Sequence, residues 1–491
     1  MGDERPNILF CISDDQSWPH AGAYGSPEVK TPNFDTIAKN GALFHHCFAP
    51  SPSCAPTRAS ILTGRNIWQN QEAGVHGSLF PAKFPVFTHL LEAGGYEVAY
   101  TGKGWGPGRW NAGGKNVARK RNPIGKRLTG KPGHYAKAFK KFMSQHNRDQ
   151  PFFFWFGSTD PHRPYSNEAV DKGLQDREFK MPGFLPDGLP IRKDLAGYSY
   201  EIERFDRELG EFIQILKDAG EYENTLIIVT SDNGMPFPRA KMHCYELGTH
   251  VPFAVQWPKQ MPGNRTINDL ISLVDLAPTF LDVAQLRRPS GLTGSSMLKI
   301  LMSDQEGQVD ASRVYVLTGK ERHDPARQYN ECYPIRTIRT HQYLYLRNFK
   351  PDRWPSGDPP SCLDLSWSDH LTRQYFDTLP ENEGLKPYYD RAVNKRPLEE
   401  VYDIRKDPYC LHNLAGLPEY KEVCESLWAK LQEKLKEQKD PRVMGKGDCF
   451  ETVPCFIPNK GSFSPPRVRD RFDHSQDKPW TYTTPQNRRD D

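Results

Sequence analysis

Short runs of consecutive apolar residues recur along the first two thirds of the chain. The first spans residues 7–12, and similar runs lie at residues 96–100, 152–156, 225–230, 251–257 and 314–317. Apolar runs of this length without polar alternation are typical of strands buried on both faces of a parallel sheet. The pattern therefore predicts a buried sheet of several strands.

Helical patterns separate these runs. Apolar residues recur at helical spacing in residues 86–93, 198–216 and 274–284. Strands that alternate with helices predict a doubly wound α/β domain, in which helices flank the sheet. Ligands of such domains bind beyond the carboxyl ends of the strands. Polar residues gather at that predicted edge, namely Asp14, Asp15, Asp160, His162, Asp232 and Asn233.

After about residue 328 the pattern changes. Shorter strands are predicted at residues 335–339, 343–347 and 399–404, followed by a charged amphipathic helix at about residues 419–438. We therefore expect a large α/β domain at residues 1–328 and a smaller α+β domain with an antiparallel sheet at residues 329–491. The tail after Pro441 is rich in Pro, Gly and charge and is expected to be irregular,. Residues 115–131 form a basic insert that we expect outside the core.

Length and charge narrow the class of protein. A chain of 491 residues is too long for one ordinary core, which favours two domains,. The net charge is only +4, and no stretch approaches the ~20 apolar residues of a membrane span,. Neither membrane insertion nor nucleic-acid binding is favoured. Because the first predicted strand follows Met1-Gly2-Asp3-Glu4-Arg5 directly, a signal peptide has no room,. The protein is expected to be either cytoplasmic or processed from a longer form.

A cysteine stands at the start of a predicted helix. Residues 54–64 read Cys-Ala-Pro-Thr-Arg-Ala-Ser-Ile-Leu-Thr-Gly. Pro56 suits the first turn of a helix, so Cys54 would lie at a helix N-terminus, where backbone N–H groups favour an anion. Arg58 lies one helical turn further on, so its guanidinium can point back at residue 54.

Two pairs of oxygen-bearing residues follow predicted strands. Asp14 and Asp15 come after the first strand, and Asp232 and Asn233 after a later one. Each pair by itself is also an ordinary helix cap or turn sequence. Together they offer hard oxygen ligands without a matching Cys/His set. This composition predicts calcium, with magnesium as the less favoured ion, and argues against zinc.

The cysteine segment matches the pattern C-x-P-[ST]-R-x-x-x-L-T-G, and with the acidic pairs the chain resembles the type I sulfatases of the alkaline-phosphatase-like superfamily. The resemblance implies that Cys54 is oxidised to Cα-formylglycine by a formylglycine-generating enzyme, for which Pro56 and Arg58 are recognition features. The hydrated aldehyde would be the nucleophile at sulfur and would complete the metal shell. Thr57 stands where the family more often has Ser.

The resemblance also assigns three further side chains. Lys103, after the second predicted strand, corresponds to a catalytic lysine of the family, Lys241 would neutralise a sulfate oxygen, and His162 would protonate the leaving group. In most members a histidine follows the lysine closely, but this chain reads Lys103-Gly104-Trp105-Gly106. His76 is the substitute candidate for removing the proton of the hydrate.

Three segments carry a narrower resemblance, to the sulfamidases (N-sulfoglucosamine sulfohydrolases): residues 231–238, 160–163 and 333–336. They imply a sulfated saccharide substrate, with heparan-type N-sulfoglucosamine as the best single hypothesis and an exported enzyme that has lost its leader. Three alternatives stay open: an O-sulfatase acting on another polysaccharide, a phosphate or phosphonate monoester hydrolase of the same superfamily, and a non-catalytic glycan-binding relative. The phosphatase alternative would be favoured by a second set of His/Asp ligands.

Overall fold

A large mixed sheet forms the centre of the molecule. The computed structural model describes residues 5–362, 370–457 and 471–481. The sheet has the strand order β4-β3-β5-β1-β6-β7-β2-β8, and β9 also pairs with β2. The strands are β1 (Asn7–Ser13), β2 (Ala42–Phe48), β3 (Glu97–Gly102), β4 (Lys126–Leu128), β5 (Phe152–Gly157), β6 (Thr225–Ser231), β7 (His250–Gln256), β8 (Arg265–Ile267) and β9 (Ile271–Ser272).

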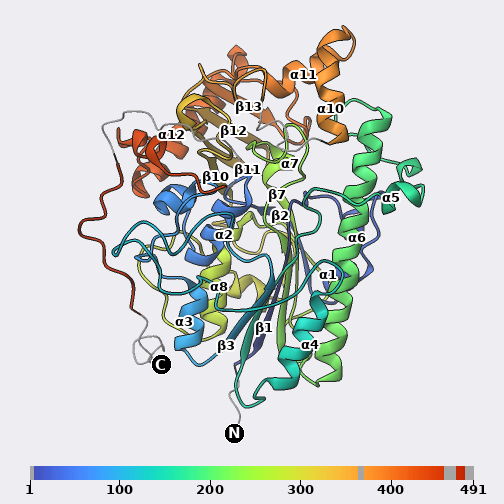
Figure 1. The fold of residues 1–491 in the computed structure, drawn as a ribbon, viewed down its shortest axis with the longest axis vertical. Helices are drawn as coiled ribbons and strands as arrows, with labels where there is room; N and C mark the ends of the chain where they lie inside the picture. The colour runs from blue at the N-terminus through green and yellow to red at the C-terminus, as the bar shows by residue number, and fades with distance from the viewer. Residues whose placement is uncertain (1–4, 363–369, 458–470, 482–491) are drawn as a thin grey trace.

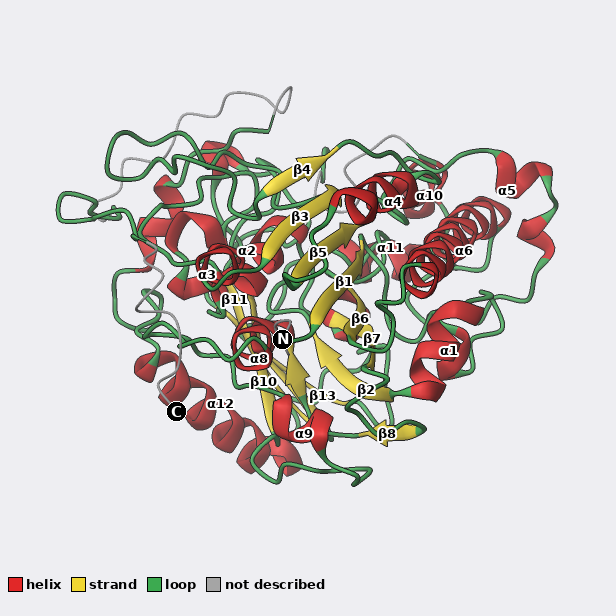
Figure 2. Ribbon diagram, turned by 90° about the horizontal axis from the view of Figure 1, so that it is seen from below, coloured by secondary structure: helices red, strands yellow, loops and turns green. Residues whose placement is uncertain are grey.

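Helices cover both faces of this sheet. The described helices are α1 (Pro32–Asn40), α2 (Cys54–Thr63), α3 (Phe87–Ala93), α4 (Tyr135–Gln145), α5 (Glu168–Asp171), α6 (Leu189–Asp218), α7 (Glu246–Thr249), α8 (Leu276–Val283), α9 (Leu298–Met302), α10 (Leu371–Thr378), α11 (Lys386–Val393) and α12 (Lys421–Glu437). Figure 2 shows α1, α4 and α6 on one face and α2, α3 and α8 on the other.

The side chains of β1 show why the sheet is buried on both sides. Ile8 and Phe10 belong to the core that contains α3 and α8, whereas Leu9 and Cys11 belong to the core that contains α1, α4 and α6. Successive side chains of a strand point to opposite faces, so only an uninterrupted apolar run satisfies both cores. The predicted doubly wound α/β architecture is confirmed.

A second, antiparallel sheet lies over the carboxyl ends of the large one (Figure 1). Its order is β10-β11-β12-β13, with β10 (Tyr315–Lys320), β11 (Ile335–Thr340), β12 (Tyr343–Asn348) and β13 (Glu399–Asp403). Helix α12 packs on it through Leu431 and Leu435, which share a buried cluster with Ile338 and Tyr345. The smaller α+β unit is thus present. The predicted boundary at residue 328 between the two domains stays a prediction.

Three elements differ from the sequence-based expectations. The run at residues 314–317 was expected in the large sheet, but it forms β10, which pairs antiparallel with β11 in the small one. An apolar run indicates burial and does not say in which sheet. Strand β2 was not predicted, because His45 and His46 interrupt its apolar pattern. The basic insert was expected outside the core, and its strand β4 is indeed an exposed edge strand beside β3, but Ile124 of the insert is fully buried in the core that contains α3 and α8.

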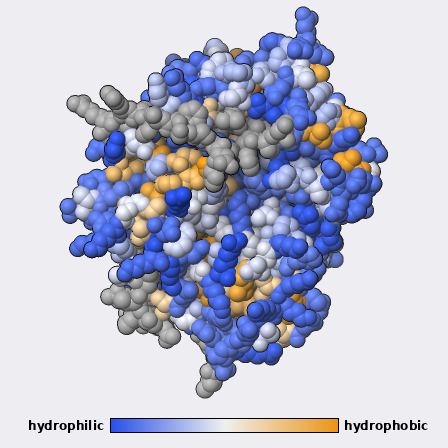
Figure 3. All heavy atoms as spheres, in the orientation of Figure 1, coloured by the Kyte–Doolittle hydropathy of each residue, from blue (hydrophilic) through white to orange (hydrophobic). Residues whose placement is uncertain are grey.

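Hydrophilic residues dominate the face of the molecule in Figure 3, and apolar residues form only small scattered patches there. Among the described residues, none of the helices combines the length and the apolar character needed to cross a bilayer.

Candidate active site

The register of β1 and β6 brings the two acidic pairs together. These strands are parallel neighbours, and Ser13 pairs with Ser231 at their ends. The residues that follow therefore leave the sheet side by side. The backbone N–H of Asp15 donates to Asp232 Oδ1 at 3.2 Å. The side-chain amide of Asn233 donates to Asp15 Oδ1 at 2.8 Å.

Cys54 completes this cluster from the first position of α2. Candidate ligand atoms of Asp14, Cys54 and Asp232 all lie within 4.8 Å of one another. In the described part of the chain, Asp14 Oδ1 and Asn233 Oδ1 are buried oxygens without a hydrogen-bond partner. Buried oxygens without a partner are costly, and a bound cation would satisfy both. The predicted metal residues therefore fit a hard divalent ion such as calcium.

Three cations balance the carboxylates; Arg58 and Lys241 are buried, and Lys103 is partly buried. Arg58 Nε lies 2.7 Å from Asp232, Lys103 Nζ lies 2.5 Å from Asp14 and Lys241 Nζ lies 2.6 Å from Asp15. Burial pushes the pKa of Asp14 upwards, but Lys103, His162 and Arg58 together outweigh it and hold the pKa below its usual value. Burial likewise opposes Lys241 at Asp15, whose pKa is also lowered. Both carboxylates are therefore ionised at neutral pH and able to bind a cation.

The loop after β3 braces the helix that carries Cys54. Arg58 Nη1 donates to the backbone oxygens of Lys103 and Gly104 at 2.8 and 3.1 Å. The indole N–H of Trp105 donates to the backbone oxygen of Ala55 at 3.1 Å. Trp105, close after Lys103, is thus used for structure, because its indole holds the first turn of α2.

His162 lies in the loop after β5, and hydrogen bonds from α6 hold this loop in position. Arg204 on α6 binds Asp160 with two hydrogen bonds, of 2.6 and 2.7 Å. The backbone oxygen of Asp160 accepts a hydrogen bond from Asp14 N at 2.8 Å, which ties the loop to the end of β1. His162 Nδ1 donates to the backbone oxygen of Arg163 at 2.6 Å. The other ring nitrogen, Nε2, lies 3.9 Å from Asp15 and faces the cluster.

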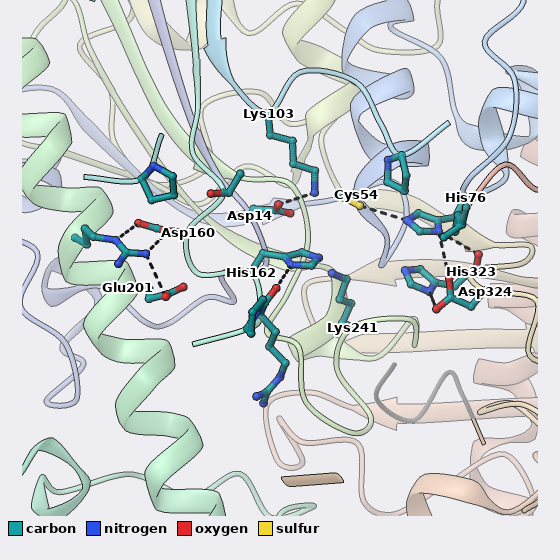
Figure 4. A pocket seen from close by; sticks show the side chains of 17 residues that line it. Asp14, Cys54, His76, Lys103, Asp160, His162, Glu201, Lys241, His323 and Asp324 are labelled. Carbon is teal, nitrogen blue, oxygen red and sulfur yellow. Dashed lines mark hydrogen bonds and ion pairs between the residues drawn. The ribbon is translucent and has the colours of Figure 1, made fainter. Parts of the chain in front are cut away.

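A pocket of about 570 Å³ opens over this cluster (Figure 4). Its lining includes five of the predicted site residues: Asp14, Cys54, Lys103, His162 and Lys241. Four others lie directly behind them and are fully buried: Asp15, Arg58, Asp232 and Asn233. A volume of this size suits a small molecule or a short saccharide segment, since ligand pockets typically measure about 300–1,000 Å³.

On the opposite side of Cys54, histidines line the pocket. His76 Nε2 lies 3.5 Å from Cys54 Sγ. Its Nδ1 lies 3.1 Å from the backbone oxygen of His323, and the two imidazole rings stack with centroids 3.9 Å apart. Asp324 Oδ1 is 3.9 Å from His76 Nδ1. Burial lowers the pKa of His76 well below its ordinary value, so the ring is neutral at physiological pH.

The sequence pattern missed several pocket residues. His323 and Asp324 follow β10, and Glu201 and Arg204 lie on α6. Burial raises the pKa of Glu201 to about 8. Only the position of His323 and Asp324 just beyond a strand could have marked them in advance. Nothing local shows that this segment meets residue 76.

Comparisons with known proteins agree with this geometry. The sulfatase family model matches residues 6–286. A model described as the C-terminal part of N-sulphoglucosamine sulphohydrolase matches residues 239–355.

Two curated relatives align over most of their length. An ulvan-active sulfatase of Formosa agariphila is 29% identical over 440 residues, which cover 89% of this chain and 81% of the relative. The N-sulphoglucosamine sulphohydrolase of Homo sapiens is 27% identical over 492 residues, which cover 91% of this chain and 93% of the relative.

A solved structure described as a complex with D-glucosamine-2-N,6-O-disulfate shares the fold. Its TM-score is 0.67 at 20% identity, over 89% of this chain and 98% of that one. Since the sulfatase model matches more than half of the sequence, the chain belongs to the sulfatase family and is a sulfuric ester or sulfamate hydrolase.

Proposed function

We propose that the protein removes sulfate from N-sulfated glucosamine in a heparan-type saccharide, with formylglycine at residue 54 and one calcium ion. One observation carries the proposal. Cys54 starts α2 with its Sγ within 4.8 Å of carboxylate oxygens of Asp14 and Asp232, and it shares one pocket with Lys103, His162 and Lys241. The side chains that sulfuryl transfer requires thus converge on residue 54.

Calcium would be held by Asp14, Asp15, Asp232 and Asn233, with residue 54 completing the shell. The ion supplies Lewis-acid stabilisation of a sulfate oxygen and of the nucleophilic oxygen. The two buried oxygens without partners, Asp14 Oδ1 and Asn233 Oδ1, support this assignment. Magnesium is less suitable, because it demands near-ideal octahedral geometry and keeps several waters.

Formylglycine supplies a hydrate with two hydroxyl groups, one to take the sulfuryl group and one through which sulfate is expelled. Lys103 and Lys241 line the pocket, and their ammonium groups stabilise negative charge on the equatorial sulfate oxygens,. Arg58 lies behind them and fixes Asp232 against the helix. The N-terminus of α2 adds backbone N–H groups that favour an anion at residue 54,.

His162 would act on the leaving group. Nδ1 of His162 donates to the backbone oxygen of Arg163, and Nε2 faces Asp15 at 3.9 Å. Burial, together with Lys241, lowers the pKa of His162, so Nε2 carries a proton only in the charged ring. That imidazolium would donate to the nitrogen or oxygen that departs from sulfur. The benefit is greatest for a sugar amine or alcohol, since these are poor leaving groups without a proton.

The narrower substrate assignment is supported by the sulphohydrolase C-terminal match. That region, residues 239–355, contains the pocket residues Lys241, His323 and Asp324. The relative from Formosa agariphila acts on ulvan according to its name and is 29% identical, against 27% for the human sulphohydrolase. An O-sulfatase acting on another polysaccharide is therefore the first alternative that an experiment must address.

The substrate test compares sulfate release from glucosamine N-sulfate, glucosamine 6-O-sulfate and ulvan oligosaccharides, measured by ion chromatography. The protein is co-expressed with a formylglycine-generating enzyme, and Cys54→Ala is the matched control. We expect the fastest release from the N-sulfate. Release from O-sulfated substrates alone would contradict the N-sulfate assignment and leave the sulfatase mechanism in place.

A second candidate, a phosphate or phosphonate monoester hydrolase, has one observation in its favour. Ligand atoms of His76, His323 and Asp324 lie within 4.8 Å of one another, which would suit a second metal ion. Paired metals are typical of phosphatases. Two metal equivalents per chain together with turnover of a phosphate monoester would favour this candidate over the sulfatase function.

The formylglycine-generating enzyme is a proposed partner in maturation, supported by Cys54, Pro56 and Arg58 in the matching motif. We also propose that the protein is exported. Export rests on the family alone, because the described cysteines, including Cys449 and Cys455, are free thiols and give no sign of an oxidising compartment,.

A further inference from the structure

The reaction proposed above needs a group that accepts a proton from residue 54, and Trp105 stands near Lys103 where most of the family has a histidine. The Trp105 indole N–H donates a hydrogen bond to the backbone oxygen of Ala55. An indole N–H is a donor only, so this residue cannot accept the proton. The pocket must supply the acceptor from another element.

His76 is placed at that position by a different loop. The short 3-10 helix at residues Gln71–Gly74 leads directly into it. The side chain is buried, with 6% of its surface exposed, and its Nε2 lies 3.5 Å from Cys54 Sγ. In the unmodified chain, Sγ stands in for the oxygens of the hydrate.

The hydrogen bonds of His76 determine which nitrogen carries its proton. Nδ1 lies 3.1 Å from the backbone oxygen of His323, which can only accept. The proton of the neutral ring is therefore on Nδ1, and Nε2 presents a lone pair to residue 54. A hydrogen bond from the other nitrogen is the usual device by which proteins fix an imidazole tautomer.

The loop after β10 holds this ring in place. The backbone N–H of His76 donates to the backbone oxygen of Arg322 at 3.3 Å. The ring stacks on His323 at 14° between planes, and Asp324 Oδ1 is 3.9 Å from Nδ1. A carboxylate near Nδ1 stabilises the imidazolium that forms when Nε2 gains a proton. Figure 4 shows His76, His323 and Asp324 grouped on one side of Cys54, with Lys103 and His162 on the other.

We propose that His76 Nε2 accepts the proton from residue 54 that expels sulfate, and that His323 and Asp324 are its positioning residues. The inference rests on the proposed formylglycine function. The free hydroxyl on the sulfated hydrate carbon gives its proton to Nε2, and the O–H electron pair forms the carbonyl bond. The bond from carbon to the sulfated oxygen breaks, its electron pair leaves with sulfate, and the aldehyde is restored. His76 then returns the proton to water.

The test uses His76→Gln in protein that is fully converted at residue 54, with 4-nitrophenyl sulfate as the probe. This leaving group needs little protonation, so transfer to the enzyme should proceed in the variant. We expect a rapid burst of about one nitrophenol per active site, followed by turnover slowed about 10²–10⁴-fold. Intact-mass spectrometry should find one retained SO₃ group on the peptide that contains residue 54.

His89→Gln is the matched control. His89 is also a buried histidine, 2% exposed, but it lies on α3 with Nε2 bonded to Asn122. It should show neither a burst nor a retained SO₃ group. Asp324→Asn should retain less SO₃ than His76→Gln. If His76→Gln does not fold, the same burst and mass measurements are made on Asp324→Asn. A slow His76→Gln without retained SO₃, or one as fast as the wild type, would overturn the proposal.

Metal analysis separates the remaining possibilities. One calcium per chain in both the wild type and His76→Gln supports the role as proton acceptor. Two metals in the wild type and one in His76→Gln would overturn it and make His76, His323 and Asp324 ligands of a second ion. If converted wild-type protein turned over no sulfated substrate at all, the proposed function itself would fail, independently of His76.

Discussion

Two groups of side chains, which come from different parts of the fold, lie on opposite sides of residue 54, and we call them the carboxylate wall and the histidine wall. The carboxylate wall, formed by Asp14, Asp15, Asp232 and Asn233, stands on the ends of two neighbouring strands of one sheet. The histidine wall, formed by His76, His323 and Asp324, joins a loop of the large unit to the loop after β10 of the small sheet.

The difference lies in what holds each wall. Strand register and three ion pairs fix the carboxylate wall. The histidine wall is held by backbone hydrogen bonds and one ring stack between segments 247 residues apart in sequence. The first wall is built from loops of the large sheet alone, whereas the second depends on the contact between a loop of the large unit and the loop after β10.

Cys54→Ala gives the largest expected effect, because it removes the proposed nucleophile on which both walls act. Turnover should fall to background, since alanine offers no nucleophile and no second oxygen. The protein should stay folded, because replacing a thiol with a methyl group removes one buried atom and no ion pair. Sulfate release and a thermal melt check the two parts. An active Cys54→Ala would refute the mechanism and point to a metal-activated water.

Removing calcium with a chelator tests the proposed metal site in the carboxylate wall without changing the histidine wall. Treatment with EGTA should abolish turnover reversibly, and calcium should restore it. Calcium should also stabilise the fold, by about 2.7 kcal/mol at roughly 100 times its dissociation constant. The physical reason is that Asp14 Oδ1 and Asn233 Oδ1 regain a partner. A melting temperature and activity indifferent to EGTA, in protein shown to be free of metal, would contradict the assignment.

His162→Ala distinguishes the two proposed proton transfers. His162 would give a proton to the leaving group, and His76 would accept one from residue 54. The turnover rate should fall about 10²–10⁴-fold for substrates with poor leaving groups such as sugar amines. The turnover rate of 4-nitrophenyl sulfate should fall far less. The variant should show no retained SO₃, in contrast to His76→Gln. Rates on both substrate classes, with His89→Gln as the control, provide the comparison. Equal losses on both substrates would reduce His162 to a sulfate-binding contact.

The carboxylate wall was largely predictable from sequence, and the reason is physical. Apolar runs mark β1 and β6, parallel strands end at one edge, and the residues that follow them must therefore meet. The start of α2 at Cys54 was equally readable from Pro56. For the same reason the long buried strands β1, β3, β5, β6 and β7 were predicted, whereas β2, where His45 and His46 interrupt the run, and the short strands β4, β8 and β9 were not.

The histidine wall was not predictable to the same degree. The sequence indicates His76 only as a substitute candidate, and no sequence pattern points to His323 or Asp324. Their positions depend on how the small sheet packs on the large one, and no local pattern encodes that docking. The run that forms β10 was even expected in the wrong sheet. Residues that act together across separately formed units need the three-dimensional structure to be recognised.

The smallest expected effect concerns the C-terminal segment that supports the histidine wall. His474 Nε2 lies 2.6 Å from Glu72, in the short helix that leads to His76, and its Nδ1 lies 2.7 Å from Asp477. The hydrogen bond to Glu72, with a further contribution from Asp477, raises the pKa of His474 to about 9.

Because this pKa is higher in the folded protein than the ordinary value of about 6.5, protonation stabilises the folded state. The contribution is complete below about pH 6.5 and is lost as the pH rises through about 9. We expect the melting temperature to fall slightly across that interval in the wild type, and to change less in His474→Gln, which cannot gain the proton. His412→Gln is the control, since His412 is an exposed histidine with 79% of its side chain accessible. Parallel melting curves for the wild type and His474→Gln over this pH range would show that the charged hydrogen bond to Glu72 does not hold the segment.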